Sequence, residues 1–221
     1  IRPDVMVEFR QPYIGPAMRK YGNMFRAGDA PNAALANRVR TVDLRLLSGD
    51  TAVHSDMVMW HYDEPVEAAA LQLLNVLFSV PQLSVRLEDI PRDHFDMVRH
   101  YTAYWRRNRD VLLDGRFVPT SPLANYPLMS GHGESKQIHV AFEELVIPLA
   151  AGPSSVAVDL VNAKASERLA ALVPEDLGTY RVRVLDALGA TVREETLRLT
   201  AGVHLFAVPP SGLVSLERLD T

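Results

Sequence analysis

Short β-type runs and helical segments alternate through the first 114 residues, and this alternation constrains the fold more than any other feature of the chain. The β-type runs cover residues 5–9, 24–28, 51–55 and 82–87. The helical segments cover residues 15–21, 33–47, 66–80 and the stretch from residue 91 onward. Such regular alternation predicts a parallel sheet with right-handed crossovers.

The number of these units bears on how complete the sheet is. Units of roughly 25–30 residues are typical of a (β/α)8 TIM barrel, in which eight units take about 250 residues. Four units therefore predict half of a TIM barrel over residues 1–115. Half a barrel would leave open strand edges, so we expect the other half to come from upstream sequence, a partner chain or a swapped homo-oligomer.

The hydrophobic pattern changes after residue 115. A stretch rich in Pro, Ser and Gly, residues 116–136, is expected to be a linker. Residues 137–221 then alternate at period two, which predicts an antiparallel β-sandwich. The predicted strands are residues 138–142, 156–160, 180–184, 191–199, 203–208 and 214–219. The predicted fold class is therefore α/β plus all-β.

Composition excludes several classes of function. A net charge of −4 gives no general affinity for nucleic acid or anionic membranes, and no apolar run is long enough to span a bilayer. Cysteine is absent, so thiol catalysis and thiolate metal sites are excluded. No H-x-x-x-H pair and no glycine-rich phosphate loop occurs, so we expect neither a metal nor a cofactor. We expect a cytoplasmic protein, although the chain opens at Ile1 and secretion therefore stays open.

Asp29 is the first candidate for catalysis. It follows the run 24–28, and the carboxyl ends of parallel strands are where α/β enzymes place their active sites. Glycoside hydrolysis needs two carboxyl groups, one of which protonates the leaving oxygen. The competing interpretation is that Asp29 caps the helix 33–47.

Other polar residues share the predicted strand ends. His54 and Asp56 follow the next run, where they could bind sugar hydroxyls or hold a loop in place. Arginines could pair with a carboxylate, and Trp60 could stack on a sugar, although ion pairs and core packing are the ordinary explanations. The candidate substrate-binding residues are Glu8, Arg10, Arg26, Arg38, His54, Asp56 and Trp60.

Several segments resemble the melibiase-type α-galactosidases. They read EFRQPY, GNMFRAGD, NRVRTVDLR, AVHSDMVMWH, DEPVEAAALQLLNVLFSVPQLSVRL and WRRNRDVLLDG. Members of that family are retaining glycoside hydrolases with a (β/α)8 barrel and a C-terminal antiparallel β domain. The resemblance implies that residues 1–115 are the C-terminal half of the barrel.

The resemblance also implies roles for single residues. Asp29 lies where the family has its general acid/base after the sixth strand, with Gly28 in place of the usual serine. Glu8 and Arg10 fall on the fifth strand, without the family's Cys/Gly-rich signature, and residues 54–60 fall on the seventh. The nucleophilic aspartate of the fourth strand would lie upstream of this chain.

The function expected from these observations is hydrolysis of terminal α-linked galactosides by a C-terminal fragment of a retaining enzyme, with Asp29 as general acid/base. Its partners would be an oligosaccharide or α-galactoside substrate and the missing half of the barrel, and the fragment alone would be inactive. One alternative is a non-catalytic carbohydrate-binding or assembly fragment. Another is a glycosidase of the same scaffold that acts on α-glucosides or N-acetylgalactosaminides.

Overall fold

A computed structural model describes residues 4–10, 15–149 and 157–219, and the chain divides into two compact units between Pro91 and Arg92. Among the described residues, 34% lie in strands and 26% in helices. The fold is therefore mixed α/β with more strand than helix, and each unit is described by itself.

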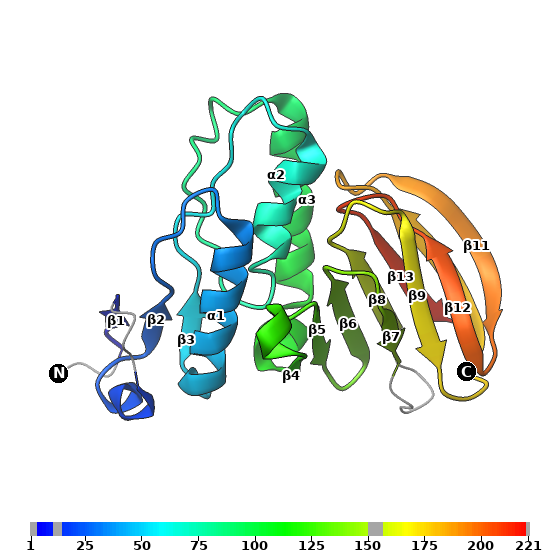
Figure 1. Ribbon diagram of the computed structural model, residues 1–221, viewed down its shortest axis with the longest axis horizontal. Helices are drawn as coiled ribbons and strands as arrows, with labels where there is room; N and C mark the ends of the chain where they lie inside the picture. The colour runs from blue at the N-terminus through cyan, green and yellow to red at the C-terminus, as the bar shows by residue number, and fades with distance from the viewer. Residues whose placement is uncertain (1–3, 11–14, 150–156, 220–221) are drawn as a thin grey trace. The chain divides into compact units, whose positions relative to one another are not determined.

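The first unit contains a small parallel sheet. Its elements are β1 (Glu8–Phe9), the 3-10 turn η1 (Pro16–Lys20), β2 (Met24–Arg26), α1 (Ala34–Ser48), β3 (Ala52–His54) and α2 (Val66–Leu74). The sheet order is β1-β2-β3, with both neighbouring pairs parallel (Figure 1). Val80 and Leu83 extend the ladder only by isolated bridges, to His54 and Val58.

The register of this sheet sorts its side chains onto two faces. Phe25 pairs with Phe9 and Val53, and these apolar side chains share one face because residues in register on neighbouring strands point to the same side of a sheet. That face packs against Leu44 of α1. Arg26, which pairs with His54, therefore lies on the opposite face.

The expectation of half a TIM barrel is wrong. Of the four predicted strand–helix units, the described residues form three short strands, while residues 82–87 make only the bridge at Leu83. Pro81 lacks an N–H for a ladder, and the chain turns at Asp89, whose N–H donates to the carbonyl of Arg86. The helix predicted from residue 91 is grouped with the second unit.

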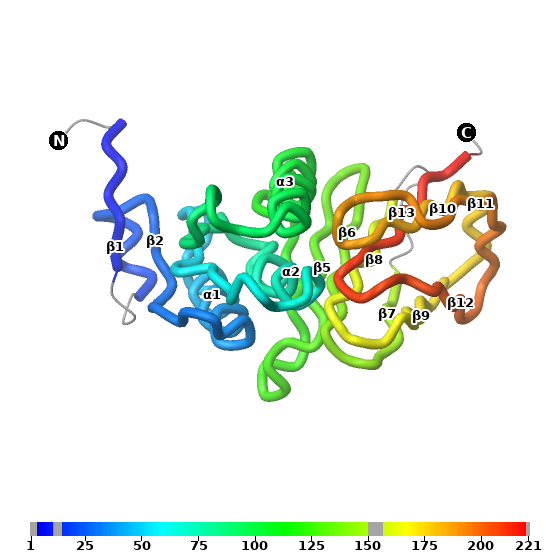
Figure 2. The backbone as a smooth tube through the Cα atoms, turned by 90° about the horizontal axis from the view of Figure 1, so that it is seen from above, coloured from blue at the N-terminus to red at the C-terminus, as the bar shows by residue number. Residues whose placement is uncertain are grey.

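The second unit consists of two facing sheets and one long helix. Its elements are α3 (Arg92–Arg107), the π-helical turn η2 (Asp110–Asp114), β4 (Arg116–Pro119), η3 (Pro122–Ala124), β5 (Leu128–His132), β6 (Lys136–Ala141), β7 (Val146–Pro148), β8 (Ala157–Asn162), β9 (Arg168–Val173), β10 (Gly178–Leu185), β11 (Thr191–Leu199), β12 (Gly202–Ala207) and β13 (Leu213–Arg218). One sheet has the order β11-β10-β13-β8-β6-β5-β4 and the other β12-β9-β7. Figure 2 shows the two layers from above.

The main core of this unit lies between the two sheets. Leu160, Val182 and Leu216 from the larger sheet and Leu169 and Phe206 from the smaller one are among its fully buried members. Along β9 and β10 buried residues alternate with more exposed ones, whereas β6 and β8 are buried on both faces.

Helix α3 joins this unit through two tyrosines. The Tyr104 hydroxyl donates to Asp159 Oδ2 over 2.8 Å, and the Tyr101 hydroxyl donates to the carbonyl of Ser211. Both rings are buried. The boundary between the compact units therefore lies before α3 at residue 91, and not at residue 115 as the pattern indicated.

The predicted linker 116–136 is in fact structured. It contains β4, η3 and β5, and β4 and β5 form an antiparallel hairpin. Ser121, Asn125 and Tyr126 take positive φ angles in the connection, which bends the chain tightly between the two strands. Proline is tolerated in β4 because β4 is an edge strand.

The prediction of a wholly antiparallel sandwich is also wrong. β6 pairs with β8 in parallel, and β7 pairs with β9 in parallel. Period-two alternation reports which face is buried, but it carries no information on strand direction. Of the predicted strand 156–160, Val156 lies outside the described residues.

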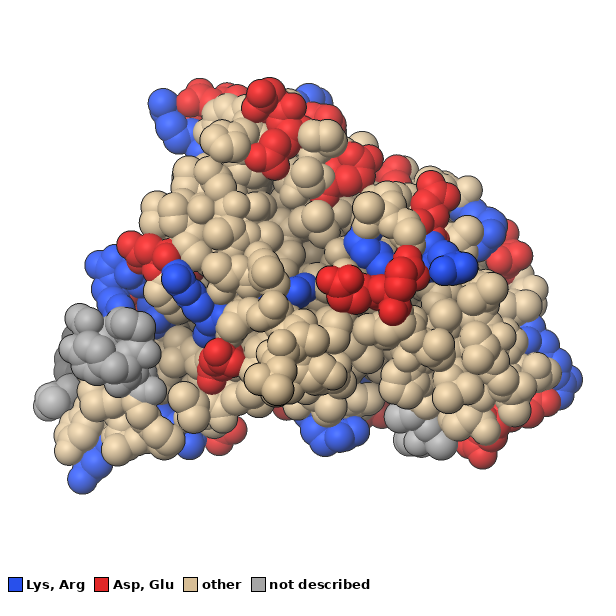
Figure 3. All heavy atoms as spheres, in the orientation of Figure 1, with Lys and Arg blue, Asp and Glu red and all other residues tan. Residues whose placement is uncertain are grey.

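The surface of the protein mixes both signs of charge. On the face in Figure 3, acidic and basic side chains are interspersed, and a broad uncharged area covers the β7–β9–β12 sheet. Val146, Leu172, Val203 and Leu205 are exposed on these three strands. Within the part of the chain that the structure describes, no helix combines the length and apolarity needed to cross a membrane.

Candidate functional site

One arginine joins two aspartates at the carboxyl ends of β2 and β3. Arg26 Nη2 lies 2.8 Å from Asp29 Oδ1, and Arg26 Nη1 lies 2.6 Å from Asp56 Oδ2. The Asp29 side chain is 60% exposed, whereas those of Arg26 and Asp56 are 11% and 3% exposed. A nearly buried guanidinium thus bridges one open and one enclosed carboxyl group.

The two aspartates differ in how they hold a proton. A hydrogen bond from the Asp56 side chain lowers the pKa of Asp29, and the positive charges of Arg26 and Arg10 act in the same direction. Burial raises the pKa of Asp56, and the hydrogen bond to Asp29 raises it further against the opposing charge of Arg26. Where the pair holds one proton, it therefore resides on Asp56 and leaves Asp29 ionised.

A second polar pair lies on the same face of the sheet. His54 Nε2 lies 3.3 Å from Glu8 Oε2, and His54 Nδ1 lies 2.8 Å from the carbonyl oxygen of Ser55. Both ring nitrogens of His54 thus face oxygen atoms. The other Glu8 oxygen lies 3.3 Å from Arg10 Nε.

Two residues that sequence reasoning missed hold these groups in place. Gln82 Nε2 donates to Asp56 Oδ1 over 3.1 Å, and its backbone N–H donates to Ser55 Oγ over 2.9 Å. Arg40 of α1 donates to the carbonyl of Gly28 over 3.2 Å and to that of Asp29. Gln82 is the first residue of the predicted strand 82–87, and this position was the one sequence signal that could have identified it.

We call Glu8, Arg10, Arg26, Asp29, His54, Asp56 and Gln82 the strand-end cluster. Six of the eight residues predicted for the site belong to it. The other two are enclosed: Arg38 in α1 is 5% exposed, and Trp60 is 2% exposed. Trp60 therefore offers no open face on which a sugar could stack.

Asp29 does not act as the cap of the following helix. The N-cap position of α1 is Ala33, and no side chain makes a capping hydrogen bond there. The structural alternative to a functional Asp29 is therefore wrong in its predicted form, because the Asp29 side chain is directed to Arg26 instead.

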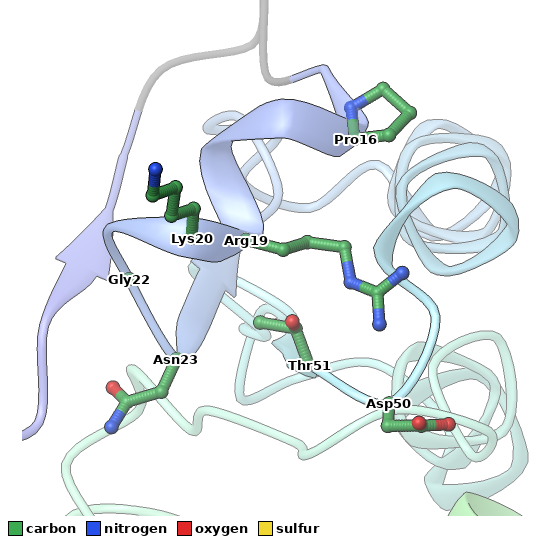
Figure 4. Close-up of a pocket in the computed structure, with 7 residues that line it drawn as sticks. All are labelled: Pro16, Arg19, Lys20, Gly22, Asn23, Asp50 and Thr51. Carbon is green, nitrogen blue, oxygen red and sulfur yellow. The ribbon is translucent and has the colours of Figure 1, made fainter.

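A separate hollow lies near the opposite ends of the strands. It has a volume of about 400 Å³, and residues of η1 and of the segments just before β2 and β3 line it (Figure 4). A Cβ at Gly49 would come within 2.4 Å of the Arg19 guanidinium, which therefore lies close to the end of α1. A cation there stabilises the helix dipole, which gives Arg19 a structural role.

The described residues contain no group of three or more His, Cys, Asp or Glu side chains suited to a metal ion. Comparison with known proteins adds no family: no family model matches the sequence, and no curated protein matches it either.

Proposed function

We propose that the strand-end cluster forms the acid/base side of a site that hydrolyses terminal α-linked galactosides with retention of configuration. The observation that carries this proposal is that Asp29 and Asp56 both contact Arg26. The pKa of Asp29 is lowered and that of Asp56 is raised, and acid/base sites commonly contain two carboxyl groups whose pKa values differ in this way. The choice of sugar follows from the resemblance of residues 1–115 to melibiase-type enzymes.

In this proposal Asp29 is the catalytic residue of the cluster because it is the exposed carboxyl group. In the first step the proton held by the pair passes from Asp56 to Asp29 along their hydrogen bond, and Asp29 delivers it to the leaving glycosidic oxygen. In the second step Asp29 takes a proton from water, which restores the proton to the pair. The nucleophilic carboxylate would come from residues outside this chain, about 5–5.5 Å from Asp29 as retention requires. Glu8 and Arg10 supply polar groups for the sugar hydroxyls, and the buried His54 holds Glu8 in place.

The test is Asp29→Asn, measured in the longest natural polypeptide that contains this chain. Turnover of an unactivated α-galactoside should fall by about 10²–10⁴-fold. A dinitrophenyl galactoside should lose less because its leaving group needs no proton. Azide should restore turnover of that substrate and form the α-galactosyl azide, since it replaces water on the acid/base side.

Asp96→Asn is a matched control for this substitution. Asp96 of α3 also lies between two arginines, 3.0 Å from Arg92 Nε and 3.1 Å from Arg99 Nη2, but it is outside the strand-end cluster. Its substitution should leave turnover unchanged. Unaltered turnover in Asp29→Asn would contradict the proposal.

One observation favours a second function, non-catalytic binding of a sugar. Arg26 and Asp56 keep Asp29 ionised, and an exposed carboxylate accepts hydrogen bonds from sugar hydroxyls without any chemistry. Calorimetry of the 221-residue chain with galactose separates the two. A binding module would bind galactose, lose affinity in Asp29→Asn and show no turnover in any longer polypeptide.

A further inference from the structure

Arg26 has no open surface to offer a substrate. Its side chain is nearly buried, and its two terminal nitrogens are engaged by different carboxyl groups. A guanidinium is a planar fork with fixed donor directions, so fixing one nitrogen on Asp56 also fixes the direction in which the other meets Asp29. This geometry differs from that of a sugar-binding arginine, which would present a nitrogen to solvent.

Asp56 is enclosed in the same way. One carboxyl oxygen contacts Arg26, and the other accepts from Gln82 Nε2. Gln82 is held in turn by the hydrogen bond from its backbone N–H to Ser55 Oγ. Asp56 can therefore influence a substrate only through its neighbours.

We propose that Arg26 and Asp56 are positioning residues, which with Gln82 form a chain of contacts that orients Asp29 toward the substrate. The proposal rests on the proposed function of Asp29. This chain of contacts runs from Gln82 through Asp56 and Arg26 to Asp29, and it passes from the end of β3 to the end of β2. Gln82 and Asp29, at its two ends, are exposed, whereas the side chains of Asp56 and Arg26 between them are nearly buried.

The charged and titratable groups around Asp29 determine how its pKa should change when a residue in the chain of contacts is substituted. Among the described residues, Arg26, Arg10 and Asp56 shift the pKa of Asp29, and Arg40 of α1 donates to its backbone carbonyl. Protonated Asp56 donates a hydrogen bond to Asp29, and an asparagine amide at the same position can donate a similar one. Alanine cannot. Asp56→Asn should therefore preserve the state of Asp29, whereas Asp56→Ala should raise the pKa of Asp29.

The experiment is a carboxyl-carbon NMR titration of Asp29 in the 221-residue chain labelled at aspartate. Compared with wild type, the midpoint for Asp29 should move to higher pH in Asp56→Ala and stay in place in Asp56→Asn and in the control Asp96→Asn. In the longest natural polypeptide, kcat for an α-galactoside should fall about 100-fold in Asp56→Ala, with little change in KM, since misplacing a catalytic group costs this much. Asparagine should rescue most of this loss.

Arg26→Lys keeps the proposal testable if Asp56→Ala does not fold. Lysine keeps the charge but is a single point donor, so it can serve only one of the two carboxyl groups well. The Asp29 midpoint should again move to higher pH. An unshifted midpoint in a folded Asp56→Ala or Arg26→Lys variant would overturn the positioning roles.

The two readouts separate failure of this inference from failure of the proposed function. A shifted Asp29 midpoint together with a wild-type polypeptide that hydrolyses no galactoside would remove the function and leave the contact chain in place. Hydrolysis that depends on Asp29 together with an unshifted midpoint would remove only the positioning roles.

Discussion

His139 on β6 makes the stability of the second unit sensitive to acid. Its side chain is buried, with Nδ1 2.8 Å from Ser130 Oγ and Nε2 3.4 Å from Gln137 Oε1. The ring of His132 lies edge-on at 5.6 Å. Burial lowers the pKa of His139 to about 3 from 6.5, and the neighbouring charge of His132 acts in the same direction. The perturbation we choose is His139→Gln, which removes the titrating group.

The direction of the effect follows from proton binding in the two states. The unfolded chain protonates His139 below pH 6.5, whereas the folded chain does so only near pH 3. Between these values the unfolded state binds more protons, so the free energy of unfolding falls as the pH falls, by about 1.4 kcal/mol per pH unit. At pH 4.5 this amounts to about 3 kcal/mol, and above pH 7 it vanishes.

Urea titrations at pH 7.5 and pH 4.5, followed by amide NMR signals of the second unit, measure this loss. We expect the wild type to lose about 3 kcal/mol more than His139→Gln between the two pH values. The difference in free energy of unfolding between the wild type and His139→Gln at pH 7.5 measures the packing cost of the substitution. Subtracting it leaves the effect of protonation. His132 titrates in both proteins, so its own contribution largely cancels. An equal loss of stability in both proteins would refute the reasoning.

Two further predictions concern stability and are checked by urea unfolding at pH 7. Tyr104→Phe should lower the free energy of unfolding of the second unit by about 1.5–3 kcal/mol, since it removes a buried hydrogen bond to the carboxylate of Asp159; a loss under about 0.5 kcal/mol would contradict this. Gly28→Ala should be neutral or stabilising by about 0.4–1 kcal/mol, because the new Cβ would meet only Arg40 Nη1, at 3.8 Å. Gly49→Ala should instead cost at least about 1–3 kcal/mol, because Gly49 combines a φ of +56° with a ψ of −126° and because its new Cβ would clash with the Arg19 guanidinium; equal effects at both glycines would contradict the distinction.

Local periodicity located helix α1 but not its buried face, since Leu35 and Leu46 of the apolar stripe are exposed. The apolar spacing of three and four predicts a helix over residues 33–47, and α1 spans Ala34–Ser48. The run 66–80 is apolar nearly all round, so its pattern gave no sign that the helix ends at Leu74. There the backbone N–H and side chain of Asn75 both donate to the carbonyl of Leu71, and the chain continues in turns.

Strand partners and strand directions could not be obtained from the same patterns. Whether β6 pairs with β8 or with a sequence neighbour depends on tertiary packing, as does the parallel direction of that pair. Pro119 and Pro122 favoured a linker, but the hairpin places Pro119 in an edge strand, where a missing N–H costs no ladder bond. The prediction of half a barrel was wrong for a related reason. The number of β/α units in a sequence does not determine how many of the predicted strands pair in a sheet.

The rule that active-site residues follow the carboxyl ends of parallel strands located most of the strand-end cluster. It did not show which of these residues is exposed to a substrate. It brought Arg26, Asp29 and Asp56 to one edge because each follows or ends a β-type run. It could not show that Asp56 is enclosed and Asp29 open, since burial depends on the neighbouring strand and on Gln82. Arg38 and Arg40 lie two residues apart on α1, and only the structure shows that Arg40 is the one that contacts the Asp29 loop.

The polar face of the β1–β3 sheet bears on the proposed positioning roles of Arg26 and Asp56. Parallel strands buried on both faces are usually apolar throughout, whereas here Arg26 and His54 alternate with Phe25 and Val53. Removing a guanidinium and a carboxylate from water costs several kcal/mol per ion, which their attraction rarely exceeds. An apolar pair in place of Arg26 and Asp56 would hold the sheet at least as well. What it would not provide is a fixed direction for Asp29, and this is the property that an acid/base site at this edge requires.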